Sequence, residues 1–198
     1  MCMTEIIHLD KTNHDTIKKQ VVYAIKQGNV IIYPTDTVYG IGGAATSESV
    51  VARIYELKRR SQSKALSVAF SDFYMLSKYC ALDASQEAVI KKYLPGPYTF
   101  IVKSSKRLPV SSSEILGIRI PNDDLIRDII QTAALPLITT SANLSGGPDV
   151  FDFSKLHPDV LAGVDVALDC GETKYKQSST VVDLIHHRLL REGAGKWG

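Results

Sequence analysis

Several short polar segments in this sequence each follow directly after an apolar run. Residues 30–33 form one such run, which stops at Pro34 and leads into the three polar residues 35–37. Residues 137–138 lead in the same way into the hydroxyl and amide side chains of residues 139–143. A buried strand that ends in a polar turn is a common place for a ligand in an open α/β sheet. The alternative interpretation is that Pro34 ends a strand and the threonines form an ordinary turn.

Basic residues occur at the ends of other apolar segments of the chain, namely Lys58 with Arg60, Arg119 and Arg191. The phosphate-binding loop G-x-x-x-x-G-K-[ST], the dinucleotide fingerprint and the G-x-S-x-G nucleophile elbow are all absent from the sequence. Cations and hydroxyls without an obvious nucleophile favour phosphoryl or nucleotidyl transfer, in which a protein mainly positions groups and neutralises charge. Arg119 has apolar neighbours, and because buried arginine is normally paired, it should meet a protein carboxylate or an anionic ligand.

The composition limits the class of protein. The chain has 198 residues, of which 44% are hydrophobic and 22% charged, and this suits one compact domain. We therefore expect residues 1–198 to form a single domain, with no second C-terminal domain. The net charge of +2 is too small to indicate a nucleic-acid partner by itself.

The N-terminal residues lack the basic segment and apolar core of a signal peptide, and no apolar run reaches the length of a membrane span. The three cysteines, Cys2, Cys80 and Cys170, form no C-x-x-C pair, which is typical of a reducing compartment. These features predict a cytoplasmic protein with no membrane association. The scattered cysteines and histidines predict no metal site.

Strands and helices alternate along the chain. Helical periodicity and capping residues predict helices that begin after Asn13, after Thr46 or Ser47, after Asp83 and after Asp123. Apolar runs predict strands over residues 5–9, 30–33, 66–70, 98–103, 117–121, 136–140, 164–168, 180–184 and 188–191. Because helices are missing between several late strands, we expect an α/β (α+β) fold with a twisted, mixed, mostly parallel sheet and surrounding helices.

Six segments appear together in an order that is typical of one family. They are Pro34 to Gly42, Leu57 to Ser67, Leu94 to Thr99, Gly117 to Pro121, Ser141 to Gly146 and Ser179 to Asp183. Over about residues 14 to 193 the chain resembles the single-domain form of the YrdC-type threonylcarbamoyl-AMP synthases. The resemblance implies the YrdC-like fold, with a large concave basic cavity. It also implies a nucleotidyltransferase that converts L-threonine, bicarbonate and ATP into threonylcarbamoyl-adenylate and pyrophosphate.

The resemblance also implies roles for particular residues. The catalytic residues, which surround the phosphates of ATP, are Lys58, Arg60, Ser141 and Asn143, and Arg191 joins them in binding ATP. The L-threonine contacts are Thr35, Thr37, Tyr39, Ser67, Arg119, Thr139 and Ser179. Mg²⁺ is expected to arrive with ATP and to be held by phosphates and water rather than by a protein cage.

The partners implied by the resemblance are a tRNA-threonylcarbamoyl transferase complex, which takes the product, and tRNA or double-stranded RNA. The chain departs from the family pattern at several positions, among them Asp149, where a serine is usual, and Ile115, where a threonine near the nucleotide is common. A carboxylate near phosphates would weaken ATP binding unless it points to solvent. An alternative therefore stays open, in which the protein is an RNA-binding or assembly factor of the YrdC-like paralogue group without adenylate synthase activity.

Overall fold

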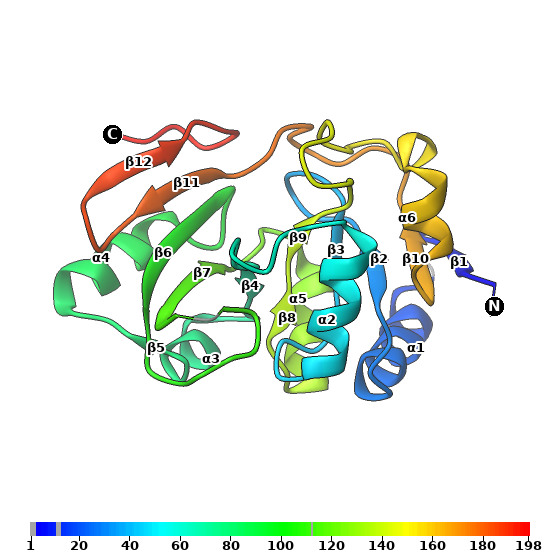
Figure 1. The fold of residues 1–198 in the computed structure, drawn as a ribbon, viewed down its shortest axis with the longest axis horizontal. Helices are drawn as coiled ribbons and strands as arrows, with labels where there is room; N and C mark the ends of the chain where they lie inside the picture. The colour runs from blue at the N-terminus through cyan, green and yellow to red at the C-terminus, as the bar shows by residue number, and fades with distance from the viewer. Residues whose placement is uncertain (1–2, 11–12, 112) are drawn as a thin grey trace.

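The computed structural model describes residues 3–10, 13–111 and 113–198, and its strands form two sheets that lie side by side (Figure 1). The strands are β1 (Glu5–His8), β2 (Ile31–Tyr33), β3 (Gly40–Gly42), β4 (Val68–Ala69), β5 (Cys80–Ala81), β6 (Tyr98–Ser104), β7 (Ile115–Arg119), β8 (Leu137–Ile138), β9 (Thr140–Ser141), β10 (Val166–Asp169), β11 (Thr180–Asp183) and β12 (Arg188–Arg191). The five-stranded sheet has the order β1-β10-β2-β3-β9. The seven-stranded sheet has the order β12-β11-β6-β7-β4-β8, with β5 paired to β6.

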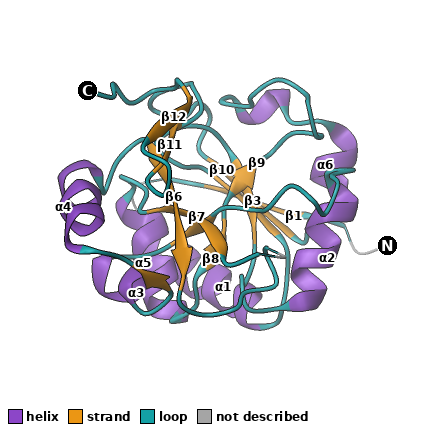
Figure 2. Ribbon diagram, turned by 60° about the vertical axis from the view of Figure 1, so that its left-hand side comes forward, coloured by secondary structure: helices purple, strands orange, loops and turns teal. Residues whose placement is uncertain are grey.

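Helices lie around the strands (Figure 2). They are α1 (His14–Lys26), α2 (Glu48–Leu57), α3 (Phe73–Ser77), α4 (Ala84–Tyr93), α5 (Asp124–Ala133), α6 (Pro158–Ala162) and a short 3-10 helix at Phe153–Lys155. The prediction of a mixed α/β fold with surrounding helices is confirmed. The prediction of one mostly parallel sheet needs correction, because six of the ten strand pairings among the described residues are antiparallel and the strands divide between two sheets. The reason is that β2–β3, β6–β7 and β11–β12 are joined by short connections without a helix, which antiparallel neighbours permit.

Side chains predicted to cap helices do so in most cases. The side chains of Ser47, Asp83 and Asp123 each accept a hydrogen bond from a backbone amide of the first helical turn, and Gln86 completes a capping box with Asp83. Helix α1 begins directly after Asn13, as predicted, but the Asn13 side chain makes no capping hydrogen bond to the helix. It accepts from the amide of Asp10 at 3.1 Å and donates to the carbonyl of His8 at 3.0 Å instead.

Strand β2 lies at the centre of the core because both of its faces are buried. Ile31 and Tyr33 belong to the apolar cluster that contains the buried faces of α1 and α5, whereas Ile32 belongs to the larger cluster that extends across the other sheet. This accounts for the continuous apolar run at residues 30–33, which is typical of a strand covered on both sides. The end of β2 is therefore packed on both sides, and the loop of residues 34–39 that follows it is buried as well.

Residues 137–141 connect the two sheets. Strand β8 pairs with β4 in the seven-stranded sheet, and after Thr139 the chain enters β9, which pairs with β3 in the five-stranded sheet. The register places Ser141 opposite Gly40. A Cβ atom on Gly42 would lie 2.0 Å from the carbonyl oxygen of Ile138, so this close approach requires glycine. The two polar segments noted in the sequence therefore meet at the junction of the sheets.

No helix in the described part of the chain is both long and apolar enough to cross a bilayer. Cys80 is buried and Cys170 is partly buried, and both are free thiols. Cys2 lies outside the described residues.

Candidate functional site

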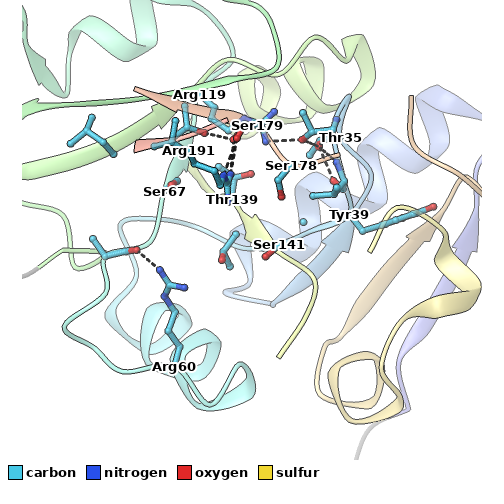
Figure 3. Close-up of a pocket in the computed structure, with 18 residues that line it drawn as sticks. Thr35, Tyr39, Arg60, Ser67, Arg119, Thr139, Ser141, Ser178, Ser179 and Arg191 are labelled. Atoms are coloured by element: carbon cyan, nitrogen blue, oxygen red, sulfur yellow. Dashed lines mark hydrogen bonds between the residues drawn. The ribbon is translucent and has the colours of Figure 1, made fainter. Parts of the chain in front are cut away.

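A cavity of about 180 Å³ lies where the two sheets meet (Figure 3). Ten of the twelve residues that the resemblance assigned to the site line this cavity. They are Thr35, Thr37, Tyr39, Arg60, Ser67, Arg119, Thr139, Ser141, Ser179 and Arg191. These residues come from both sheets and from the segment 137–141 that joins them, so the fold brings together groups that are distant in the sequence.

The wall formed by residues 35–38 is shaped by its own hydroxyl groups. The Thr35 hydroxyl accepts from the amides of Thr37 and Val38 at 3.1 and 3.3 Å and donates to the carbonyl of Val38 at 2.7 Å. It also lies 2.9 Å from the Thr37 hydroxyl. A threonine that bonds to the backbone in this way fixes a tight turn. The interpretation as an ordinary turn is thus correct as far as the backbone goes, but this turn also forms one wall of the cavity.

Two of the three arginines at the cavity are held by fixed partners on one side of it. Arg119 donates to the Thr37 hydroxyl and to the Asp36 carboxylate, in each case at 3.0 Å. Arg191 donates to the carbonyl of Ser179 at 2.8 Å and to its hydroxyl at 3.2 Å. The prediction that Arg119 meets an anion is confirmed, and the anion in the structure is the carboxylate of Asp36.

Arg60 lies across the cavity from Arg119 and Arg191 (Figure 3). Its guanidinium donates to the carbonyls of Lys64 and Ala65 at 3.1 and 3.0 Å. The lining residues include these three arginines and no carboxylate among those that the structure describes. Such an arrangement can neutralise negative charge from two sides of a bound molecule.

The structure places Lys58 and Asn143 beside the cavity and not on its lining. Lys58 is only 1% exposed, and its ammonium donates to the carbonyl of Ser141, to the carbonyl of Asn143 at 2.7 Å and to Asn143 Oδ1 at 3.1 Å. Asn143 Oδ1 also accepts from the Ser141 hydroxyl at 2.6 Å, and its Nδ2 donates to the carbonyl of Gly147 at 2.6 Å. The two residues hold the 141–147 loop together.

The electrostatic environment of Lys58 is unusual for a lysine. Burial lowers the pKa of Lys58 to about 7, the nearby charge of Arg60 acts in the same direction, and Asp149 opposes it. Burial also lowers the pKa of Arg191, and Asp149 again opposes the shift. Asp149 is exposed, yet its charge reaches both cations. Asp149, which departs from the family pattern, is therefore close enough to act electrostatically on two of the residues predicted to bind the phosphates of ATP.

The Tyr39 hydroxyl points away from the arginines (Figure 3). It donates to the carbonyl of Gly171 and accepts from the amide of Cys170, both at 3.0 Å, and lies 3.1 Å from the Cys170 thiol. Burial raises the pKa of Tyr39. The hydrogen bonds of this hydroxyl tie the residue before β3 to the loop after β10, while Tyr39 itself lines the cavity, so its predicted contact with threonine stays a prediction.

Some residues of the site were not assigned from the sequence, and three of them are polar side chains that contact or lie beside assigned residues. Thr99 and Ser178 line the cavity, and the Thr99 hydroxyl lies 2.8 Å from that of Ser179. Asp36 is buried behind the lining, against Arg119. All three lie inside the segments that carry the resemblance or directly beside one. A polar side chain in such a segment was the feature of the sequence that could have identified them as site residues.

Comparison with known proteins identifies a matching family. The family Sua5_yciO_yrdC, described as "Telomere recombination", matches residues 23–193. A putative threonylcarbamoyl-AMP synthase from Methanocaldococcus jannaschii is 34% identical over 96% of this chain and 93% of its own length. The human threonylcarbamoyl-AMP synthase is 33% identical over 84% of this chain and 62% of its own.

Two solved structures share the fold. The structure of Sua5 from Pyrococcus abyssi in complex with L-threonine superposes with a TM-score of 0.89 at 28% identity, and the match covers 96% of this chain and 58% of that one. The structure of YciO from Escherichia coli superposes with a TM-score of 0.86 at 26% identity, covering 99% and 98% of the two chains. The family match spans most of the chain and agrees with the resemblance seen in its six segments. The chain therefore belongs to the Sua5/YciO/YrdC family.

Proposed function

We propose that this protein is an L-threonylcarbamoyladenylate synthase, which makes threonylcarbamoyl-AMP and pyrophosphate from L-threonine, bicarbonate and ATP. Relatives named threonylcarbamoyl-AMP synthase align with nearly the whole chain. The Pyrococcus abyssi Sua5 structure, which shares the fold, contains L-threonine. This activity is that of a nucleotidyltransferase, and its product supplies the threonylcarbamoyl group that converts an adenosine of tRNA to threonylcarbamoyladenosine.

The observation that carries this proposal is the size and lining of the cavity. A volume of about 180 Å³ is slightly larger than the roughly 150 Å³ cavity known to hold a benzene molecule. It suits a small amino acid and is below the roughly 300–1,000 Å³ typical of sites for larger ligands. Threonine would occupy the enclosed part, and the nucleotide would extend toward Arg60 and the 141–147 loop.

The residues that line the cavity fit the charges of the reaction. The threonine amine adds to carbon dioxide formed from bicarbonate, giving a carbamate, and water is released. A carbamate oxygen then attacks the α-phosphorus of ATP, and the bond from that phosphorus to the pyrophosphate oxygen breaks. Both reactants are anions, so cations on each side lower the barrier. We assign Arg119 to the threonine carboxylate, and Arg60 and Arg191 to the phosphates.

Mg²⁺ should accompany ATP and neutralise the leaving pyrophosphate. No group of three His, Cys, Asp or Glu side chains suitable for a metal occurs among the described residues, so phosphate and water oxygens would coordinate the ion. A tRNA-threonylcarbamoyl transferase complex would take the product. We place the reaction in the cytoplasm, where tRNA and ATP are available.

The test is a reaction with labelled bicarbonate, threonine, ATP and Mg²⁺. We expect pyrophosphate release that requires threonine, together with a labelled product of the mass of threonylcarbamoyl-AMP. Omission of threonine, and its replacement by alanine, serve as controls. Pyrophosphate release that ignores threonine, or no release, would refute the synthase assignment.

The paralogue alternative predicts a different result. An RNA-binding or assembly factor would bind tRNA or double-stranded RNA without ATP, and its affinity would fall steeply as salt increases. Salt-dependent binding without threonine-dependent pyrophosphate release would favour this alternative. The match to YciO over nearly all of both chains does not separate the two functions, because a shared fold does not by itself determine function.

A further inference from the structure

Asp36 is a fully buried carboxylate next to the threonine side of the cavity. It lies in the loop between β2 and β3, and its partner Arg119 ends β7 in the other sheet. The Asp36 side chain is 0% exposed and that of Arg119 is 7% exposed. This ion pair therefore joins the two sheets at the point where the cavity forms.

The contacts of Arg119 set the orientation of its guanidinium. Asp36 Oδ1 accepts from Nη2 and the Thr37 hydroxyl accepts from Nη1, each at 3.0 Å. Because the guanidinium is planar, two fixed partners on its two terminal nitrogens define both its position and its plane. Each terminal nitrogen carries a second N–H, and these donors are available to an anion in the cavity that Arg119 lines.

Stability alone does not explain this ion pair. A buried ion pair contributes little net stability, because removing both charges from water costs about as much as their attraction returns. Asp36 Oδ2 and Arg119 Nε also have no hydrogen-bond partner among the described residues. A pair selected for stability would use these atoms, whereas a pair that holds a guanidinium in a set plane needs only the bonds that are present.

We propose that Asp36 is a positioning residue for L-threonine: it holds Arg119 in the plane that receives the substrate carboxylate and compensates its charge. This inference rests on the synthase function proposed above. Asp36 does not touch the substrate. It acts through Arg119, so its removal should weaken threonine binding and leave the phosphate side largely unaffected.

Asp36→Asn tests the proposal, because it keeps the size of the side chain and removes the charge-assisted bond. We expect the KM and the Kd for threonine to rise about tenfold or more, because a misplaced substrate contact has effects of this size or larger. The KM for ATP should stay within about twofold, since Arg60 and Arg191 do not contact Asp36. Asp36→Glu, which keeps the charge and displaces the carboxylate by one methylene, should act in the same direction and provides the test if Asp36→Asn does not fold.

Asp165→Asn is the matched control. Asp165 also pairs with an arginine, Arg53, at 2.6 Å, but neither residue lines the cavity. This variant should bind threonine as the wild type does, and thermal melting of both variants would separate a loss of stability from a loss of positioning. Threonine affinity within twofold of wild type in Asp36→Asn, or an equal loss in Asp165→Asn, would overturn the inference. Absence of threonine-dependent turnover in the wild type would instead refute the proposed function.

Discussion

Replacing Lys58 by methionine should separate its role in the 141–147 loop from a direct role at the phosphates. Methionine fills nearly the same space as the lysine stem but donates no hydrogen bond. The variant removes the bonds to the carbonyls of Ser141 and Asn143 and to Asn143 Oδ1. The backbone bond from the amide of Ser145 to the carbonyl of Lys58, at 2.9 Å, can persist.

The expected energies follow from these contacts. A hydrogen bond from a charged donor contributes about 1.5–3 kcal/mol, so three bonds give a gross loss of roughly 5–9 kcal/mol. Removing a buried ammonium also removes a desolvation penalty of several kcal/mol, which offsets much of that loss. We therefore expect the free energy of unfolding to change by no more than about 2 kcal/mol. The loop should nevertheless loosen, and turnover should fall by about 100-fold or more because Ser141 is no longer held in place.

Denaturant unfolding, amide hydrogen exchange and turnover measured on the same variant test this reasoning. The amides of Ser145 and Gly147 should exchange faster than in the wild type, while those of β2 stay protected. Lys91→Met is a matched control, because Lys91 pairs with Glu87 at the surface at 3.0 Å and should affect none of the three measurements. Unchanged loop exchange together with lost turnover would refute the positioning role and return Lys58 to direct phosphate contact. Retained turnover would refute any role in the reaction.

The lowered pKa of Lys58 adds a dependence on pH. Folding shifts this pKa from 10.5 to about 7, so between these values the unfolded chain binds more protons than the folded one. The contribution of Lys58 to stability is therefore complete above pH 10.5 and is lost as the pH falls through 7. The stability of the wild type relative to Lys58→Met should rise across this window, and a flat difference would contradict the assigned shift.

Three further substitutions test other parts of the site. Arg60→Ala should reduce turnover by about 100-fold or more without unfolding the protein, because its side chain lines the cavity and, among the described residues, bonds to two carbonyls of the following loop; substantial residual activity would move the phosphate site elsewhere. Asp149→Ser should lower the KM for ATP by a few-fold at low salt and less at high salt, because an exposed negative charge near Lys58 and Arg191 is removed; an unchanged KM would show that the charge of Asp149 does not act on bound ATP. Tyr39→Phe should cost about 1–3 kcal/mol of stability with the KM for threonine within twofold, because the hydroxyl bonds to backbone groups; a tenfold rise in that KM would make Tyr39 a threonine contact after all.

Local signals predicted the elements of the fold better than their arrangement. Ser47, Asp83 and Asp123 cap helices as predicted, since a capping side chain interacts with residues only two or three positions away. The division into two sheets was not predictable in this way. It depends on β3, which is a glycine-rich strand of three residues, and on the two-residue strands β8 and β9, which are too short to show a period.

The candidate site shows the same limit at the level of single side chains. The sequence placed Lys58 and Arg60 together, because both follow α2 and stand two residues apart. Arg59 between them has a φ of 49°, in the left-handed region, and the amide of Arg60 donates to the carbonyl of Tyr55 at 2.9 Å, so the chain turns away from the helix here. Lys58 is therefore directed into the 141–147 loop while Arg60 reaches the cavity. The four residues that resemblance grouped as one catalytic set thus divide into a pair that lines the cavity, Arg60 and Ser141, and a pair that holds the loop, Lys58 and Asn143. Because Asn143 Oδ1 accepts from both Lys58 and Ser141, a change at any of these three residues should alter the other two.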